Sequence, residues 1–161
     1  MADIRVWIVE DDPDWLRGLA GYIDGQPDMR VVFRADGPDP VRSALAEGRP
    51  VADVVLMDIM LHGQPDGIGL AEEVTRATGA KVVMLTSMEE KEFIFRSFQA
   101  GAIDYQIKSD FGTLPQTIRS AHERRAPISP EAAERMREEF RRLKKLEREL
   151  EVRKLRDLVT P

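Results

Sequence analysis

Five apolar runs alternate along the first 126 residues with segments in which apolar residues recur at helical spacing. Continuous Val, Ile and Leu runs are typical of strands covered on both faces, and strands that alternate with helices favour a parallel sheet between helical layers. The predicted strands are residues 4–9, 29–35, 51–57, 81–86 and 103–107. A helix is predicted after each strand, with stripes that include Leu19, Leu45, Leu70, Phe98 and Ile118. The pattern predicts an α/β domain of five βα units over residues 1–126.

A sixth, much longer helix is predicted for the remaining residues 127–161. Ser129-Pro130 supplies a favoured cap and a first-turn proline, and no breaker follows before Thr160-Pro161. One arc of this helix carries five apolar residues: Met136, Phe140, Leu143, Leu146 and Leu150. Glu147 and Lys154 interrupt the heptad pattern, so a continuous coiled coil is not predicted. We predict a linker or dimerisation helix; the alternatives are a partly ordered connection between domains or a helix that folds back on the first domain.

Composition and charge narrow the class of protein. Of the 161 residues, 42% are hydrophobic and 33% are charged, and no apolar run is long enough to span a membrane. The N-terminus lacks the features of a signal peptide and the chain has no cysteine, so we expect a cytoplasmic protein without disulfides. The net charge of −5 divides into −7 before Glu131 and +2 from Glu131 onward, where the chain has ten Lys and Arg and eight Asp and Glu. The negative net charge of the first part, and the mixture of acidic and basic residues in the second, argue against direct binding of nucleic acid by this chain.

Polar side chains follow four of the predicted strands. Glu10 and Asp11 follow the first strand and Asp58 the third, while Thr86 ends the fourth and Lys108 follows the fifth. Because the carboxyl ends of parallel strands meet at one edge of a sheet, we expect these side chains to lie close together. Clustered carboxylates repel one another unless a cation lies among them, and Mg²⁺ prefers such oxygen ligands. Acids, a hydroxyl and a lysine together indicate phosphoryl chemistry on a carboxylate.

Over residues 3–126 the chain resembles the receiver domain of two-component response regulators. The matching stretches are residues 8–13, 55–59, 66–67, 84–87 and 101–108. The resemblance implies a flavodoxin-like, doubly wound (βα)5 fold with strand order 2-1-3-4-5. The segment from Leu155 to Pro161 is similar to the stretch before the helix-turn-helix of LuxR-type response regulators. It implies that DNA is bound only through a further domain absent from this chain.

The same resemblance implies a role for each strand-end residue. Asp58 is the expected phosphoacceptor. Asp11 and Asp58 would bind Mg²⁺ directly together with the main-chain carbonyl of Met60, whereas Glu10 would act through a metal-bound water. Lys108 would bind the phosphoryl group. Asp12 is expected only to cap the first helix.

The resemblance also implies how the signal is passed on and how long it lasts. Thr86 would bind the phosphoryl group and form a switch pair with Tyr105, and a sensor histidine kinase would be the partner. Met60 and Met88 stand at positions that influence attack by water on the phosphoryl group. Neither methionine can orient a water molecule, so we predict slow self-dephosphorylation. The chain would be a signalling domain, and an enzyme only toward its own phosphorylation and dephosphorylation.

Three positions depart from the usual pattern of the family, and two other functions stay open. His62 and Ser109 stand where many members have proline, and Ser87 replaces a common alanine. One alternative is a Mg²⁺-dependent phosphohydrolase with an aspartate nucleophile, although such enzymes usually carry a second aspartate where this chain has Met60. The other is an adaptor that works without phosphorylation, which the retained acids, Thr86 and Lys108 argue against.

Overall fold

The computed structural model describes residues 3–87, 91–124 and 130–159, and the chain divides into two compact units, residues 1–127 and 128–161. Each unit is described by itself. The predictions for Met88, Ser129 and residues 160–161 lie outside the described residues. Within the long helix, side chains are described for Glu138 and residues 141–158, so those of Met136 and Phe140 also lie outside the description.

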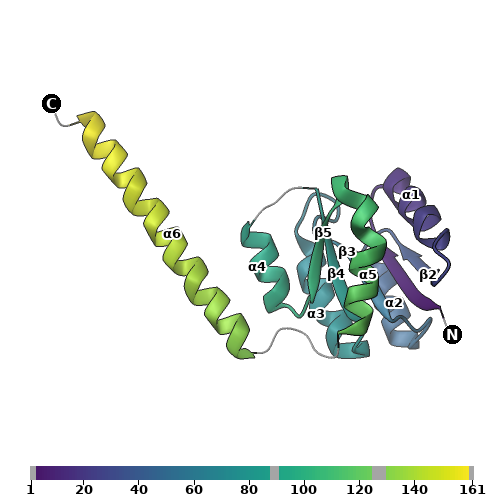
Figure 1. The fold of residues 1–161 in the computed structure, drawn as a ribbon. Helices are drawn as coiled ribbons and strands as arrows, with labels where there is room; N and C mark the ends of the chain where they lie inside the picture. Colours follow the sequence, from purple (N-terminus) through teal and green to yellow (C-terminus); the bar gives the residue numbers. More distant parts are fainter. Residues whose placement is uncertain (1–2, 88–90, 125–129, 160–161) are drawn as a thin grey trace. The chain divides into compact units, whose positions relative to one another are not determined.

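The first unit contains one parallel sheet whose strand order is β2-β1-β3-β4-β5 (Figure 1). The strands are β1 (Ile4–Val9), β2 (Met29–Ala35), β3 (Val54–Asp58), β4 (Lys81–Thr86) and β5 (Asp104–Ile107). Every residue of β3 is buried, as expected for the central strand of a sheet covered on both faces. The order confirms the predicted flavodoxin-like, doubly wound fold.

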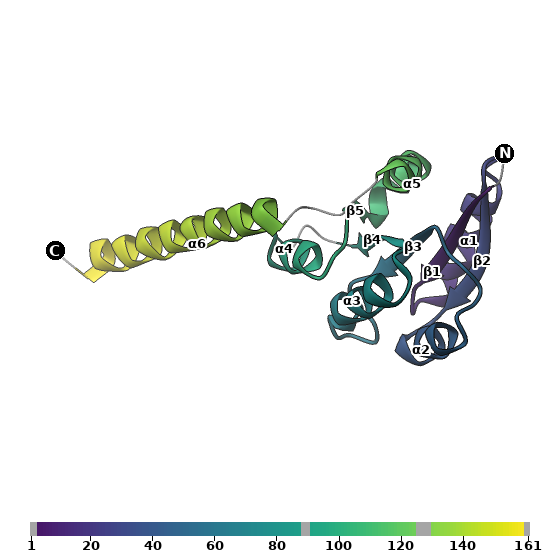
Figure 2. The ribbon, with the colours of Figure 1, turned by 90° about the horizontal axis from the view of Figure 1, so that it is seen from below.

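Helices cover both faces of the sheet (Figure 2), and the alternation of side chains along β1 separates two cores. Trp7 and Val9 pack in the core formed with α2 (Pro38–Glu47) and α3 (Asp66–Thr78), where Phe93 of α4 (Lys91–Gln99) also packs. Val6 and Ile8 pack in the core formed with α1 (Pro13–Asp24) and α5 (Leu114–Glu123). Both predicted layers of helices are therefore present.

Three strand bounds and one helix differ from the sequence predictions: β5 begins at Asp104 rather than at residue 103, and β3 ends at Asp58 rather than at residue 57. β3 begins at Val54 rather than at Val51, and Val51 is 55% exposed. Asp53 joins the segment before β3 to β1: its main-chain N–H donates to the carbonyl oxygen of Arg5, and its carboxylate accepts from the Arg5 guanidinium. After β5, residues Lys108–Thr113 form a short 3-10 helix, η1, where no helix was predicted.

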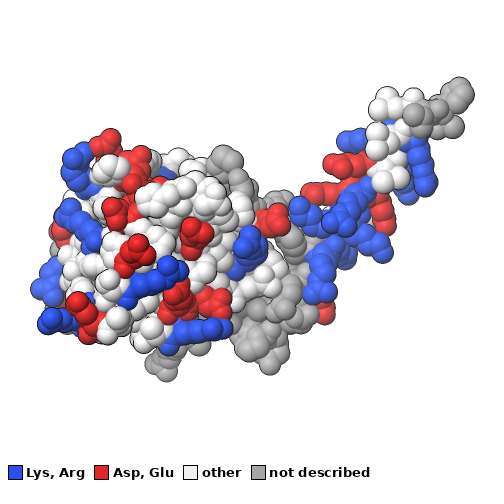
Figure 3. All heavy atoms as spheres, turned by 180° about the vertical axis from the view of Figure 1, so that it is seen from behind, with Lys and Arg blue, Asp and Glu red and all other residues white. Residues whose placement is uncertain are grey.

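The second unit contains the single helix α6 (Pro130–Val159), which confirms the predicted long helix. Among its described side chains, Leu143, Leu146 and Leu150 are 46%, 43% and 56% exposed. Basic and acidic side chains are interleaved along it (Figure 3). Across the residues that the structure describes, no helix combines the length and the apolar character needed to cross a membrane.

Candidate functional site

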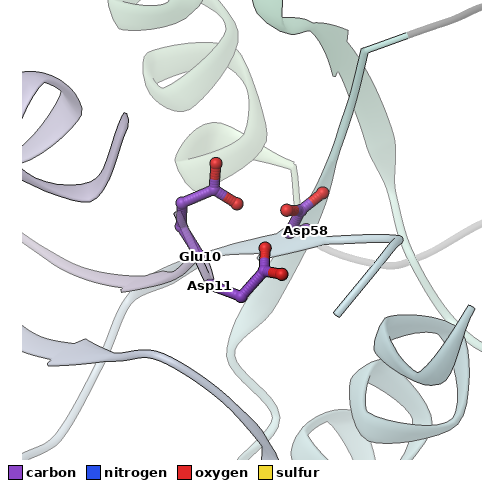
Figure 4. A group of neighbouring side chains, drawn as sticks. All are labelled: Glu10, Asp11 and Asp58. Atoms are coloured by element: carbon purple, nitrogen blue, oxygen red, sulfur yellow. The ribbon is translucent and has the colours of Figure 1, made fainter. Parts of the chain in front are cut away.

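Three carboxylates meet where β1 and β3 end side by side. β1 pairs with β3, so Glu10 and Asp11, which follow β1, lie beside Asp58, the last residue of β3. One carboxylate oxygen from each residue lies within 4.8 Å of the other two, and Figure 4 shows the three side chains converging. Glu10 and Asp58 are buried. The prediction that these strand ends bring their acids together is confirmed.

The start of α1 turns the chain away from this cluster. The Asp12 carboxylate accepts hydrogen bonds from the main-chain N–H groups of Asp14 (2.9 Å) and Trp15 (3.2 Å), and Pro13 occupies the first turn. Asp12 is therefore the N-cap that the sequence predicted. The cap places the Trp15 ring beside the acids, with its centroid 5.6 Å from Lys108 Nζ.

Lys108 links two of the acids directly. Its Nζ atom donates to Glu10 Oε1 at 2.6 Å and to Asp58 Oδ2 at 3.1 Å, and only 11% of its side chain is exposed. Burial lowers the pKa of Lys108, but its hydrogen bonds and the charges of the two carboxylates outweigh burial and raise the pKa. The Lys108 ammonium thus stands within reach of any group attached to Asp58.

The donor set fits a divalent cation. Burial, followed by the neighbouring Asp58, raises the pKa of Glu10 to about 8, even though Lys108 opposes this change. Among the described residues, Glu10 Oε2 is the one buried side-chain nitrogen or oxygen without a hydrogen-bond partner. Carboxylate oxygens that are partly unsatisfied and repel one another are suitable ligands for Mg²⁺ or for its bound water.

The loop after β3 fixes Asp11. The main-chain N–H of His62 donates to Asp11 Oδ2 at 2.9 Å, and His62 has a positive φ of 52°. Leu61 and Gln64 close the loop through two main-chain hydrogen bonds of 2.8 and 3.1 Å. A proline at position 62 would have no N–H to make this bond. The departure noted in the sequence therefore gives Asp11 an additional partner.

Gly67 allows α3 to begin directly against the backbone of Asp58. A Cβ atom on Gly67 would lie 1.8 Å from the carbonyl oxygen of Asp58 and 2.9 Å from that of Ile59. The Gly67 N–H donates to the Ile59 carbonyl oxygen at 3.0 Å. Since only glycine leaves room for this approach, Gly67 sets the position of the Asp58 main chain.

A pocket of about 320 Å³ opens over Asp58. Its lining includes Asp11, Met60, Thr86 and Lys108, so four other predicted site residues border the same space. Glu10 lies beneath them, fully buried. Tyr105 is not part of this lining: it is half-buried on β5, and its ring meets Phe98 edge to face with centroids 6.3 Å apart.

The sequence did not reveal three of the contacts that shape the site. Trp15 had no assigned role, yet it borders the pocket and lies against Lys108. The His62 amide depends on the conformation of a loop rather than on residue type. The bond between Lys108 and Glu10 joins residues 98 positions apart, and only the strand order brings them together.

Comparison with known proteins places this geometry in a family. Residues 6–119 match the model of the response regulator receiver domain. The transcriptional regulatory protein LiaR of Bacillus subtilis is 35% identical over 121 residues, which are 73% of this chain and 56% of LiaR. The response regulator protein VraR of Staphylococcus epidermidis is 29% identical over 157 residues, 92% of this chain and 73% of VraR.

Solved structures agree. A LuxR-family two-component response regulator from Aurantimonas sp. superposes with a TM-score of 0.68 at 28% identity, covering 86% of this chain and 99% of that one. The response regulator domain of Thermotoga maritima CheB gives 0.65 at 25% identity, with 80% and 99% covered. The chain spans about half the length of LiaR and of YxjL, another regulator of Bacillus subtilis. The chain belongs to the receiver domains of two-component response regulators and is related to the LuxR-type regulators.

Proposed function

We propose that this chain is a phosphorylation switch in which Asp58 accepts a phosphoryl group from a sensor histidine kinase. Phosphorylation and Mg²⁺ binding are typical of the family. An Asp58 carboxylate oxygen forms a bond to phosphorus while the bond from phosphorus to the donor's imidazole nitrogen breaks, and the imidazole leaves with the electron pair. Mg²⁺, when bound, neutralises charge on the transferring group. Asp11, Asp58 and the Met60 carbonyl would hold the ion directly, and Glu10 would hold it through water.

One observation carries this proposal. Lys108 Nζ lies 3.1 Å from Asp58 Oδ2, in a pocket that the Thr86 side chain also borders. A phosphoryl group on Asp58 would therefore find an ammonium and a hydroxyl beside it. Charge that develops on phosphoryl oxygens is stabilised most by donors already fixed in place.

The test uses acetyl phosphate as a small donor in the presence of Mg²⁺. We expect the intact chain to gain the mass of one phosphoryl group and Asp58→Asn to gain none. Asp39→Asn removes an exposed carboxylate on α2 and serves as the matched control. Equal modification of Asp58→Asn would overturn the assignment, and release of phosphate far beyond one equivalent would favour the phosphohydrolase instead.

We also propose that Thr86 and Tyr105 pass the signal to the surface formed by α4, β5 and α5. Thr86 ends β4 beside the pocket, and Tyr105 lies on the adjacent strand, where it pairs with Met84. A new phosphoryl group recruits the Thr86 hydroxyl, and the space that this movement leaves admits the Tyr105 ring. The added charge of the phosphoryl group would thus shift the equilibrium between two arrangements of Thr86 and Tyr105.

The leucine stripe of α6 is our candidate for the dimer contact. Leu143, Leu146 and Leu150 lie on one face of α6, a helix of 30 residues, and each is about half exposed. Burial of such an apolar face removes it from water, and a second copy of the chain would bury it. The interleaved charges along α6 suit a helix that contacts protein rather than nucleic acid (Figure 3). As LiaR is named a transcriptional regulatory protein, we propose that the paired form controls transcription through a DNA-binding domain outside this chain.

Sedimentation of the full chain tests the stripe and the switch together. We expect acetyl phosphate and Mg²⁺ to increase the dimer fraction, and Leu146→Asn to decrease it. Leu155→Asn lies outside the arc of the stripe, at a residue 63% exposed, and should leave the dimer fraction unchanged. Thr86→Ala should abolish the response to the donor. If the unmodified chain stays monomeric, or if both leucine variants behave alike, the stripe does not form the contact.

The lifetime of the phosphoryl group should depend on Met60. Met60 borders the pocket and is 38% exposed, but its thioether cannot orient a water molecule for attack on phosphorus. Met60→Asn is therefore expected to speed phosphate loss several-fold, whereas the apolar Met60→Leu leaves it unchanged. The same substitutions at Met88 test the second predicted position. Decay is followed by intact mass after the donor is removed, and equal decay in all variants would contradict the idea.

A further inference from the structure

Gln106 is a buried amide in the strand that leads into Lys108. It is the third residue of β5, its side chain is 6% exposed, and five hydrogen-bond contacts surround it. Nε2 faces the carbonyl oxygens of Ile107 (3.2 Å) and Asp110 (2.9 Å) and the Thr113 hydroxyl oxygen (2.9 Å), which are three acceptors for its two protons. Oε1 accepts from the Thr117 hydroxyl (2.8 Å), and the Thr113 hydroxyl lies 3.2 Å from it.

These partners determine the orientation of the amide. Two of the groups around Nε2 are carbonyl oxygens, which can only accept, so the nitrogen must face them. The oxygen then faces the Thr117 hydroxyl on α5, which can donate. The reversed orientation would place oxygen against two carbonyl oxygens. A fully satisfied polar network in a buried position rigidifies the backbone that it joins.

The backbone joined by Gln106 is the turn that carries Lys108. The two carbonyl groups that accept from Nε2 belong to Ile107 and Asp110, one on each side of Lys108 and Ser109. Asp110 departs from helical geometry, with φ −98° and ψ 34°, and no side chain caps the start of η1 at Ile107. The regular hydrogen bonds of a helix therefore do not hold this turn by themselves. The Thr113 hydroxyl adds a bond to the Asp110 carbonyl oxygen at 2.9 Å.

We propose that Gln106 is a positioning residue for phosphoryl transfer, acting through Lys108; this inference rests on the proposed function. Nζ of Lys108 must stay 3.1 Å from Asp58 Oδ2 while a phosphoryl group arrives. A flexible four-carbon side chain reaches that point reliably only if its main chain is fixed. Gln106 fixes the main chain of Lys108 through hydrogen bonds to the carbonyl groups before and after that residue. The same amide accepts a hydrogen bond from Thr117, which connects the turn to α5.

The first experiment compares Gln106→Met with Ile118→Val. Methionine fills the same volume without any donor or acceptor, whereas Ile118→Val removes one buried methyl group from α5 without touching the turn. With acetyl phosphate and Mg²⁺, we expect Gln106→Met to phosphorylate about tenfold more slowly, in line with the sensitivity of such steps to small misplacements. Ile118→Val should keep the rate of the unmodified chain. Equal rates for the two variants would overturn the proposal.

A double-mutant cycle separates positioning from general stability. In a Lys108→Ala background, Gln106→Met should cause no further loss of rate, because the group that it positions is already absent. An additional tenfold loss there would show that Gln106 acts elsewhere, and would overturn the proposal. Thr117→Val removes only the donor to Oε1 and should give a smaller fall with the same dependence on Lys108, which keeps the test decisive if Gln106→Met fails to fold. If the unmodified chain is not phosphorylated on Asp58, the proposed function itself fails.

Discussion

Gly67→Ala is expected to destabilise the receiver unit by about 3 kcal/mol or more and to remove most of its phosphorylation. The new Cβ would stand 1.8 Å from the carbonyl oxygen of Asp58, and both this atom and the nearby Ile59 carbonyl are main-chain atoms that no side-chain rotation can move. Alanine favours a helix by roughly 0.5–1 kcal/mol over glycine, so the steric clash outweighs this gain. Either α3 moves outward or Asp58 moves, and both outcomes disturb the phosphoacceptor.

Gly69 provides the matched control in the same helix. A Cβ atom on Gly69 would meet nothing within 4 Å, so Gly69→Ala should stabilise the unit slightly and leave phosphorylation unchanged. Urea unfolding gives the free energy of unfolding, and intact mass after acetyl phosphate treatment gives the rate. Similar behaviour of the two alanine variants would show that Gly67 tolerates a side chain and that the close approach to Asp58 is not a constraint.

The fold was predictable because its strongest signals are local. The run from Val54 to Met57 is apolar at every position, which indicates a strand covered on both faces wherever it lies in the chain. The boundaries depend on tertiary contacts instead. Val51 was expected in the same strand but lies outside β3, because the charged Asp53, which pairs with Arg5, separates it from Val54. The 3-10 helix that begins at Lys108 is bonded to the buried Gln106 side chain, a contact that no local pattern reveals.

Which residues meet at the strand ends was predictable for a different reason. Parallel strands end at one edge, so polar residues at those ends converge without any knowledge of distances. Which of them form bonds was not predictable. Lys108 could have pointed into solvent, and its contact with Glu10 accompanies burial of both side chains, which are 11% and 0% exposed. The Asp11 contact needs a left-handed residue at position 62, a backbone state that the residue type His62 does not dictate.

Lys108→Met is expected to slow phosphoryl transfer to Asp58 by about 10²–10³-fold, the usual consequence of removing one preorganised donor from a reacting oxyanion. The variant keeps the length and much of the volume of the side chain but loses the charge that bonds Asp58 Oδ2 and Glu10 Oε1. The same change should strengthen Mg²⁺ binding by about tenfold, or about 1.4 kcal/mol. The reason is that the Lys108 ammonium, which competes with Mg²⁺ for the cluster of three carboxylates, is no longer present. Transfer and metal affinity therefore change in opposite directions.

This opposition distinguishes a direct role of Lys108 from damage to the fold. A disordered site would lose both phosphorylation and Mg²⁺ affinity, whereas loss of the ammonium alone weakens the first and strengthens the second. Calorimetric titration gives the Mg²⁺ affinity, and intact mass gives the transfer rate. Lys81→Met removes a lysine from the start of β4, at the opposite end of the strand from Thr86, and should change neither quantity. Weaker Mg²⁺ binding in Lys108→Met, or an unchanged transfer rate, would mean that the ammonium does not stand between these carboxylates in solution.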